Sequence, residues 1–105
     1  MYSPDKWIIV KLTNDKESIL KVLAGWSGSY LEGQSWRMNS GISKVVEEGD
    51  YYLFEGYSGS TYKCHKKAYG TNMIMSGIVS QLLEQTLYKA EVLEEQDFSQ
   101  LLTNF

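Results

Sequence analysis

Short apolar runs alternate with turn-forming residues up to Gly70, whereas the apolar positions after Gly70 recur every three or four residues. Short runs rich in apolar, β-branched and aromatic residues, bounded by Gly, Asn, Asp and Ser, are typical of strands. Apolar residues that recur every three or four positions share one face of a helix. The chain is therefore expected to form an α+β domain whose strands come mainly first.

Six segments before Gly70 and one after it carry the strand pattern. They are residues 7–12, 18–26, 35–38, 42–46, 51–54, 61–65 and 90–93. Tight turns separate most of them, so successive strands are expected to pair as an antiparallel meander. The pattern predicts one twisted, mainly antiparallel sheet of about five to six strands.

The segment 18–26 also fits a helix. Asn14 with Glu17 three residues later has the form of a capping box, and Gly25 could end the helix that it opens. A strand is favoured, because the run continues into a Gly/Ser/Trp segment and pairs naturally with the run before it.

A long helix is predicted over residues 71–88 and is expected to cover one face of the sheet. Thr71 or Asn72 can cap its first turn. Gly77 in its middle suggests a close approach to the sheet, because glycine is otherwise unfavourable there. Asp97 is expected to cap a short final helix over 98–102. The apolar positions of the long helix are Ile74, Met75, Ile78, Val79, Leu82, Leu83 and Leu87.

A chain of 105 residues is enough for one domain, so 1–105 is taken as a single domain.

Composition gives little support for catalysis. Cys64 and His65 are the one cysteine and the one histidine of the sequence, which excludes an internal disulfide. Neighbours on a strand point to opposite faces, so the two side chains are not expected to act as a nucleophile and its base. Cys64 is expected in the core and His65 in solvent. We expect no enzyme, no cofactor and no metal site.

The formal net charge of −3 argues against a nucleic-acid partner, which usually binds a basic protein. The cations Lys63, Lys66 and Lys67 are expected to form a solvated sheet edge. The longest N-terminal apolar run, 7–10, is shorter than a signal peptide or a membrane span requires. These features predict a cytoplasmic protein without a membrane partner.

A near-repeat of the form G-[WY]-S-G-S is the most unusual local motif, and it occurs at residues 25–29 and 56–60. Glycines let a backbone approach a ligand, serines offer hydroxyls and aromatic rings offer a stacking face. The two loops could therefore form a pocket for a nucleotide, a sugar or a peptide terminus, although ordinary turns with packed aromatics are the favoured explanation of the motif. The candidate residues are Trp26, Ser27, Ser29, Tyr30, Tyr57, Ser58 and Ser60.

A protein-binding surface is the favoured function. Trp, Tyr and Arg are the usual anchors of protein interfaces, and Trp36, Arg37 and Asn39 add such groups to the loop aromatics Trp26, Tyr30 and Tyr57. We expect a non-enzymatic binding protein with a protein partner, and a small-molecule ligand in the paired loops is the alternative. An open sheet edge leaves a homo-oligomer as a further possibility.

Residues 36–42, 49–50 and 57–64 resemble small uncharacterised accessory proteins encoded by tailed bacteriophages. The resemblance covers roughly residues 25–70 and carries no defined motif or activity. It implies a phage accessory protein in the host cytoplasm, a class that often inhibits host machinery or host defence. No functional residue can be transferred from it.

Overall fold

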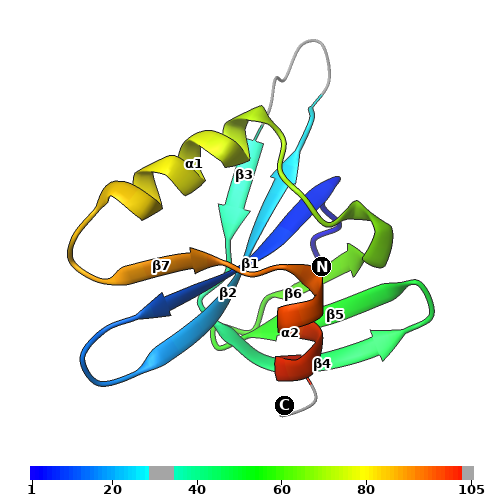
Figure 1. Ribbon diagram of the computed structural model, residues 1–105. Coiled ribbons are helices and arrows are strands. Elements are labelled where there is room, and N and C mark those ends of the chain that lie inside the picture. The colour runs from blue at the N-terminus through cyan, green and yellow to red at the C-terminus, as the bar shows by residue number, and fades with distance from the viewer. Residues whose placement is uncertain (29–34, 103–105) are drawn as a thin grey trace.

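The computed structural model describes residues 1–28 and 35–102 (Figure 1). The elements in chain order are β1 (Lys6–Thr13), β2 (Ser18–Trp26), β3 (Ser35–Met38), β4 (Ile42–Glu48), β5 (Tyr51–Gly56), β6 (Thr61–His65), a 3-10 turn (Lys66–Ala68), α1 (Met73–Glu84), β7 (Lys89–Val92) and α2 (Glu95–Leu102). The α+β prediction is confirmed. Residues 18–26 form a strand, and the helical alternative for them is wrong.

The strands form two antiparallel sheets, so the prediction of one sheet is wrong. Four strands pair in the order β3-β2-β1-β7, and three pair in the order β4-β5-β6. The predicted meander is interrupted between β3 and β4. Before this break β1 pairs with β2 and β2 with β3, and after it β4 pairs with β5 and β5 with β6. The strands before the break and those after it belong to different sheets.

A corner at residues 39–41 separates the sheets. The Asn39 N–H donates to the Val22 carbonyl and so continues the β2 pairing. Two residues later, the Gly41 carbonyl accepts from the Tyr57 N–H in the other sheet. Gly41 has φ +130°, and a Cβ there would lie 2.4 Å from Ile19 Cδ1. A residue with a side chain would therefore be strained and would clash with β2.

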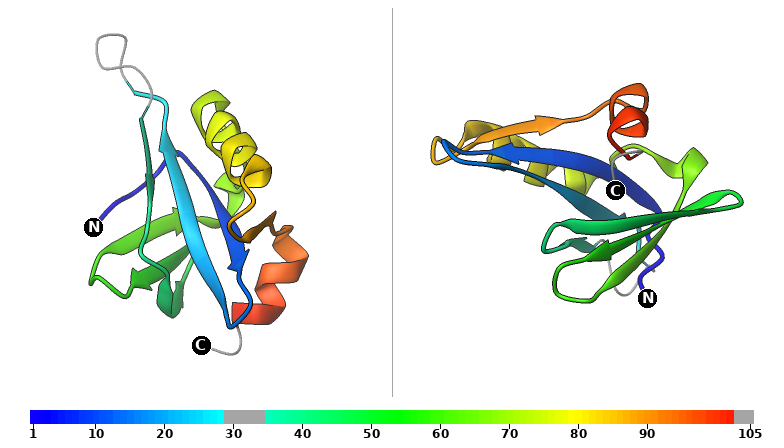
Figure 2. Two further views of the ribbon diagram at one scale, coloured as in Figure 1. Left: turned by 90° about the vertical axis from the view of Figure 1, so that its left-hand side faces the viewer. Right: turned by 90° about the horizontal axis from the view of Figure 1, so that it is seen from below.

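Strand β1 is buried on both faces, which explains its unbroken apolar run. Trp7 and Ile9 face the three-stranded sheet, whereas Ile8 and Val10 pack with Met75 of α1. Figure 2 shows α1 on one side of β1 and β2 and the three-stranded sheet on the other. The alternation of side chains along the strand thus divides the core into two layers.

Aromatic rings fill the layer between the sheets. Trp7 lies at its centre, with ring centroids 5.4 Å from Phe54, 4.8 Å from Tyr69 and 5.6 Å from Phe98. The Trp7 indole N–H donates to the His65 carbonyl at 2.7 Å. Phe98 brings α2 onto this cluster. That helix begins earlier than predicted, at Glu95, so Asp97 lies in its first turn and does not cap it.

Helix α1 is shorter than predicted. Asn72 caps it as expected, because its side-chain oxygen accepts from the Met75 N–H at 3.0 Å. The helix ends at Glu84, and Gln85 is already extended. Leu87 therefore lies beyond the helix and is 87% exposed. Neither helix in the described residues has the length and apolar composition needed to cross a membrane.

The close approach between helix and sheet occurs at Gly25, and the prediction for Gly77 is wrong. A Cβ at Gly25 would lie 2.4 Å from Met75 Sδ, whereas a Cβ at Gly77 would meet nothing within 4 Å. Gly77 is on the exposed side of α1. Met75 can reach the sheet because Gly25 on β2 has no side chain. Gly77 on the helix has no part in this contact.

Candidate functional site

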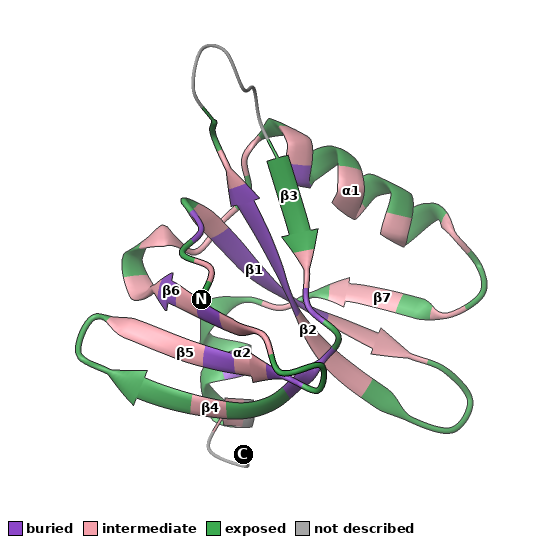
Figure 3. Ribbon diagram, turned by 180° about the vertical axis from the view of Figure 1, so that it is seen from behind, coloured by how far each residue is buried: buried purple, intermediate pink, exposed green. Residues whose placement is uncertain are grey.

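Strand β3 lies at one edge of the four-stranded sheet as the structure describes it. Ser35, Trp36 and Arg37 are exposed, and Trp36 retains 43% of its accessible surface. Figure 3 shows this exposed strand beside the buried C-terminal half of β2. An exposed tryptophan next to an exposed arginine on an edge strand is a group of residues suited to a protein interface.

The register directs two backbone positions of β3 away from β2. Ala24 pairs with Arg37, and the Asn39 N–H donates to the Val22 carbonyl. Hydrogen-bonded pairs recur at every second residue of an antiparallel ladder. The N–H and C=O groups of Trp36 and Met38 therefore point toward the outer side of the strand.

Arg37 joins an aromatic cluster that the sequence did not reveal. Its guanidinium carbon lies 4.4 Å from the centroid of the Tyr2 ring. Tyr2 in turn lies 6.2 Å from Trp26 and 5.0 Å from Tyr62, measured between ring centroids. Burial raises the pKa of the Tyr62 hydroxyl, and the charge of Arg37 partly offsets that effect. The arginine is therefore held in place by the N-terminal segment.

Trp26 and Ser27 help to fix that N-terminal segment. The Trp26 indole N–H donates to the Ser3 carbonyl at 3.0 Å, and the Ser27 N–H donates to Asp5 Oδ2 at 2.8 Å. Trp26 is half-buried. The predicted binding residues Ser29 and Tyr30 of the same loop lie outside the described residues.

Asn39 is not an exposed anchor, and that prediction is wrong. The residue is 4% exposed, and its side-chain oxygen accepts from the Val22 N–H at 2.8 Å. Asn39 follows an exposed strand in sequence, but the chain turns inward at the corner between the sheets. At the end of the β2–β3 ladder, the Asn39 side-chain oxygen accepts from the Val22 N–H in place of a backbone carbonyl.

The second loop, residues 56–60, is a tight turn with an exposed tyrosine. Tyr57 retains 68% of its accessible surface. The Ser58 N–H donates to Ser40 Oγ at 2.9 Å, and the two serine hydroxyls lie 3.2 Å apart. The Gly56 N–H donates to the Ser60 carbonyl at 2.8 Å. Ser58 and Ser60 therefore stabilise the turn itself.

The described parts of the two loops make different contacts. Trp26 and Ser27 donate hydrogen bonds to Ser3 and Asp5 of the N-terminal segment. Tyr57 and Ser58 instead donate to Gly41 and Ser40 at the corner between the sheets. Trp26 and Ser27 therefore belong with β3 and the N-terminus, and Tyr57 and Ser58 with the corner at 39–41.

Cys64 is in the core as expected, but His65 is not in solvent as predicted. Cys64 is fully buried, and burial raises the pKa of its thiol. His65 is half-buried and packs edge-on to Tyr51, with its Nδ1 accepting from the Lys67 N–H at 3.0 Å. Lys66 forms an ion pair with Glu47. Within residues 1–28 and 35–102, no three His, Cys, Asp or Glu side chains gather as metal ligands do.

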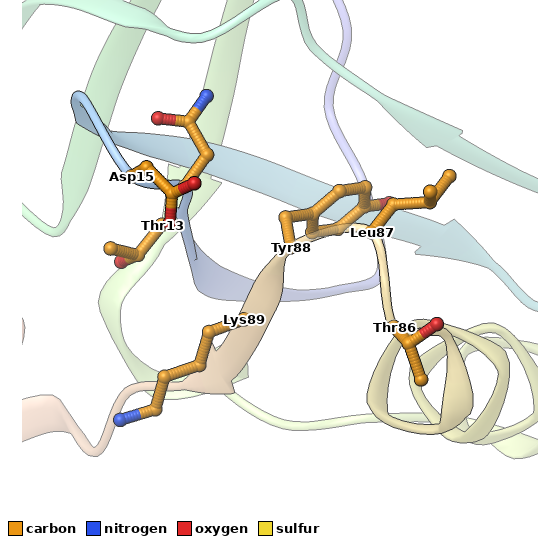
Figure 4. Close-up of a pocket in the computed structure, with 7 residues that line it drawn as sticks. Thr13, Asp15, Thr86, Leu87, Tyr88 and Lys89 are labelled. Carbon is orange, nitrogen blue, oxygen red and sulfur yellow. The ribbon is translucent and has the colours of Figure 1, made fainter.

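A groove at the C-terminal end of β1, near Thr13, was not predicted from the sequence. It has a volume of about 560 Å³ and lies between the β1–β2 turn and the segment that joins α1 to β7 (Figure 4). Its walls are Thr13, Asn14, Asp15, Thr86, Leu87, Tyr88 and Lys89. Pairing of Thr13 with Lys89 brings the two walls together. No local motif announces this groove, because its two sides come from distant parts of the chain.

Comparison of the chain with protein-family models, with curated proteins and with solved structures finds no match in any of the three. The candidate functional features of the chain are therefore strand β3 and the groove.

Proposed function

We propose that this chain is a non-enzymatic binding protein that acts through a protein–protein surface centred on β3. The observation that carries the proposal is the exposure of Trp36 beside Arg37 on an edge strand. Tryptophan and arginine contribute disproportionately to binding energy at protein interfaces. The stacking of Arg37 on Tyr2 supports this role, because a guanidinium already held in place loses less conformational entropy on binding.

The partner contributes an extended segment that lies along β3. The backbone groups of Trp36 and Met38 point toward the outer side of the strand, where such a segment can accept and donate main-chain hydrogen bonds. Trp36 and Arg37 project to opposite faces of the sheet, so they contact the partner on both sides of the added strand. Main-chain bonds supply affinity in this arrangement, and the two side chains supply specificity.

Inhibition of a host factor or host defence system is the biological role that we propose for this binding. It rests on the resemblance of residues 25–70 to phage accessory proteins.

The proposal is tested by comparing tagged variants as bait in lysate of the natural host. Trp36→Ala combined with Arg37→Ala is expected to lose the captured protein while its thermal unfolding remains cooperative. Tyr57→Ala is the matched control, because it removes an exposed aromatic side chain from the β5–β6 turn of the other sheet. Equal capture by the double variant and the wild type would remove β3 as the binding surface.

A further inference from the structure

We propose that the groove between the β1–β2 turn and the α1–β7 connection binds a neutral saccharide of one or two rings. This site is separate from β3, and the inference is independent of the proposed protein partner. The main groove measures about 560 Å³, and a second hollow of about 240 Å³ adjoins it. Thr13, Asn14 and Tyr88 line both. Small-molecule sites commonly have volumes of about 300–1,000 Å³.

Two side-chain amides hold the walls of this groove in place. The Asn14 Oδ1 accepts from the N–H groups of Lys16 and Glu17, at 2.8 and 2.9 Å. On the opposite wall, the Gln85 Oε1 accepts from the N–H groups of Leu87 and Tyr88, at 2.9 and 3.2 Å.

The Gln85 amide also forms hydrogen bonds on this wall through its nitrogen. Its Nε2 donates to the Leu82 and Tyr88 carbonyls, at 2.9 and 2.6 Å. Both walls are thus fixed by hydrogen bonds within the protein, so a ligand would meet a site that is already formed.

Several polar side chains that line the groove have no hydrogen-bond partner among the described residues. In the described part of the chain, the Asp15 carboxylate, the Thr86 hydroxyl and the Tyr88 hydroxyl form no hydrogen bond or ion pair. A carboxylate accepts hydrogen bonds from two hydroxyls, and a hydroxyl both donates and accepts. These are the groups needed to pair with neighbouring hydroxyls of a polyol.

The charges favour a neutral ligand. Asp15 and Lys89 line the main groove, and Glu17 and Lys21 line the adjoining hollow, so each hollow has one carboxylate and one amine. Lys89 could attract an anion, but its Nζ lies 3.1 Å from Glu91 Oε1. Figure 4 shows its side chain extending away from the Tyr88 ring. The two carboxylates offset the two lysines that line the hollows, so the groove has no excess positive charge to favour a nucleotide or a free phosphate.

The apolar part of the groove fits the C–H face of a sugar ring. Leu87 is 87% exposed, and Tyr88 beside it is half-buried and lines both hollows. Thr13 and Asp15 lie on the opposite wall (Figure 4). An aromatic ring facing hydrogen-bonding side chains suits a ligand that is apolar on its faces and polar around its rim.

The test is a backbone-amide NMR titration with glucose, N-acetylglucosamine and maltose, each raised to about 10 mM, ten times a Kd of about 1 mM. Binding by at least one of them should shift the amides of 13–17 and 85–89 and leave β3 unchanged. Asp15→Ala and Tyr88→Ala should weaken that binding at least tenfold, whereas Tyr88→Phe, which keeps the ring and loses only the hydroxyl, should weaken it less. Asp15 is exposed on a turn, so its variant tests the site even where Tyr88→Ala disturbs the fold.

Two further samples separate the possible results. Inorganic phosphate and adenosine monophosphate should leave these amides unshifted, and the Trp36→Ala, Arg37→Ala double variant should bind the saccharide like wild type. Saturable shifts with phosphate alone would overturn the proposal. So would the absence of shifts with all three saccharides. Neither result would bear on the protein-binding role of β3.

Discussion

The guanidinium of Arg37 rests on the ring of Tyr2, 4.4 Å from its centroid, and thereby joins edge strand β3 to the N-terminal segment. The backbone of Tyr2 is bound to the other sheet, because its N–H donates to the Thr61 carbonyl and its carbonyl accepts from the Lys63 N–H. Tyr2 therefore links the two sheets and supports the arginine of the candidate surface.

Replacing Tyr2 by Ala should lower the free energy of unfolding by about 2 kcal/mol, since the ring contacts with Trp26 and Tyr62 and the stacking of Arg37 are lost together. Tyr2→Phe keeps the ring and should remain within about 0.5 kcal/mol of wild type. Urea unfolding of the three proteins measures both values. Equal stability of Tyr2→Ala and wild type would show that the N-terminal segment does not hold the sheets together.

Two glycine variants should change stability in opposite directions. Gly25→Ala places a Cβ 2.4 Å from Met75 Sδ and should cost about 1–3 kcal/mol. Gly77→Ala meets no neighbour and should stabilise α1 by about 0.5–1 kcal/mol, because alanine is the better helix former. Thermal unfolding of both variants tests the packing of α1. A stabilising Gly25→Ala would contradict the described approach of helix and strand.

Tyr69 should make stability depend on pH in the alkaline range. Its hydroxyl accepts from the Ile9 N–H at 3.0 Å and donates to the Leu93 carbonyl at 2.6 Å. Burial raises the pKa of this hydroxyl from 10.0 to about 12. The unfolded chain thus ionises first, so the stabilisation is fully present below pH 10 and is lost as the pH rises toward about 12.

Tyr69→Phe isolates this effect. The variant should be less stable by about 1–3 kcal/mol below pH 10, because two backbone groups lose their partner. That difference should shrink as the pH rises, because only the wild type loses stability through ionisation at this position. Unfolding free energies measured across the range provide the comparison. A difference that stays constant with pH would contradict the buried position of the hydroxyl.

Asn39→Ala should lower stability by about 1–2 kcal/mol, because the buried Val22 N–H loses its acceptor. Partner capture by the folded variant should be unchanged, since Asn39 is not on the surface. Unfolding and capture assays on the same preparation separate the two effects. Loss of capture without loss of stability would restore Asn39 as a binding residue.

Local patterns were sufficient for most elements of the fold. The uninterrupted apolar run 7–10 marks a strand buried on both faces, and Asn72 marks the start of α1. The division into two sheets could not be predicted in this way. It occurs at the corner where Gly41 lies against Ile19, and only the folded chain brings these two residues together.

The site was predictable to a similar extent. Trp36, Arg37 and Tyr57 were predicted as interface residues because of their residue types, and all three are exposed in the structure. The support from Tyr2 had no signal in the sequence, because it arises from pairing between the N-terminus and β6. Burial of Asn39 was also unforeseen, because the same residue type serves exposed turns and buried ladder ends.

Native mass spectrometry of the tagged protein, purified gently from its natural host, tests the protein-binding role most directly. The wild type should carry a macromolecular partner in stoichiometric amount, and the Trp36→Ala, Arg37→Ala double variant should be recovered without it. A partner that stays bound to the double variant, or a wild type recovered with none, would contradict a protein-binding role centred on β3.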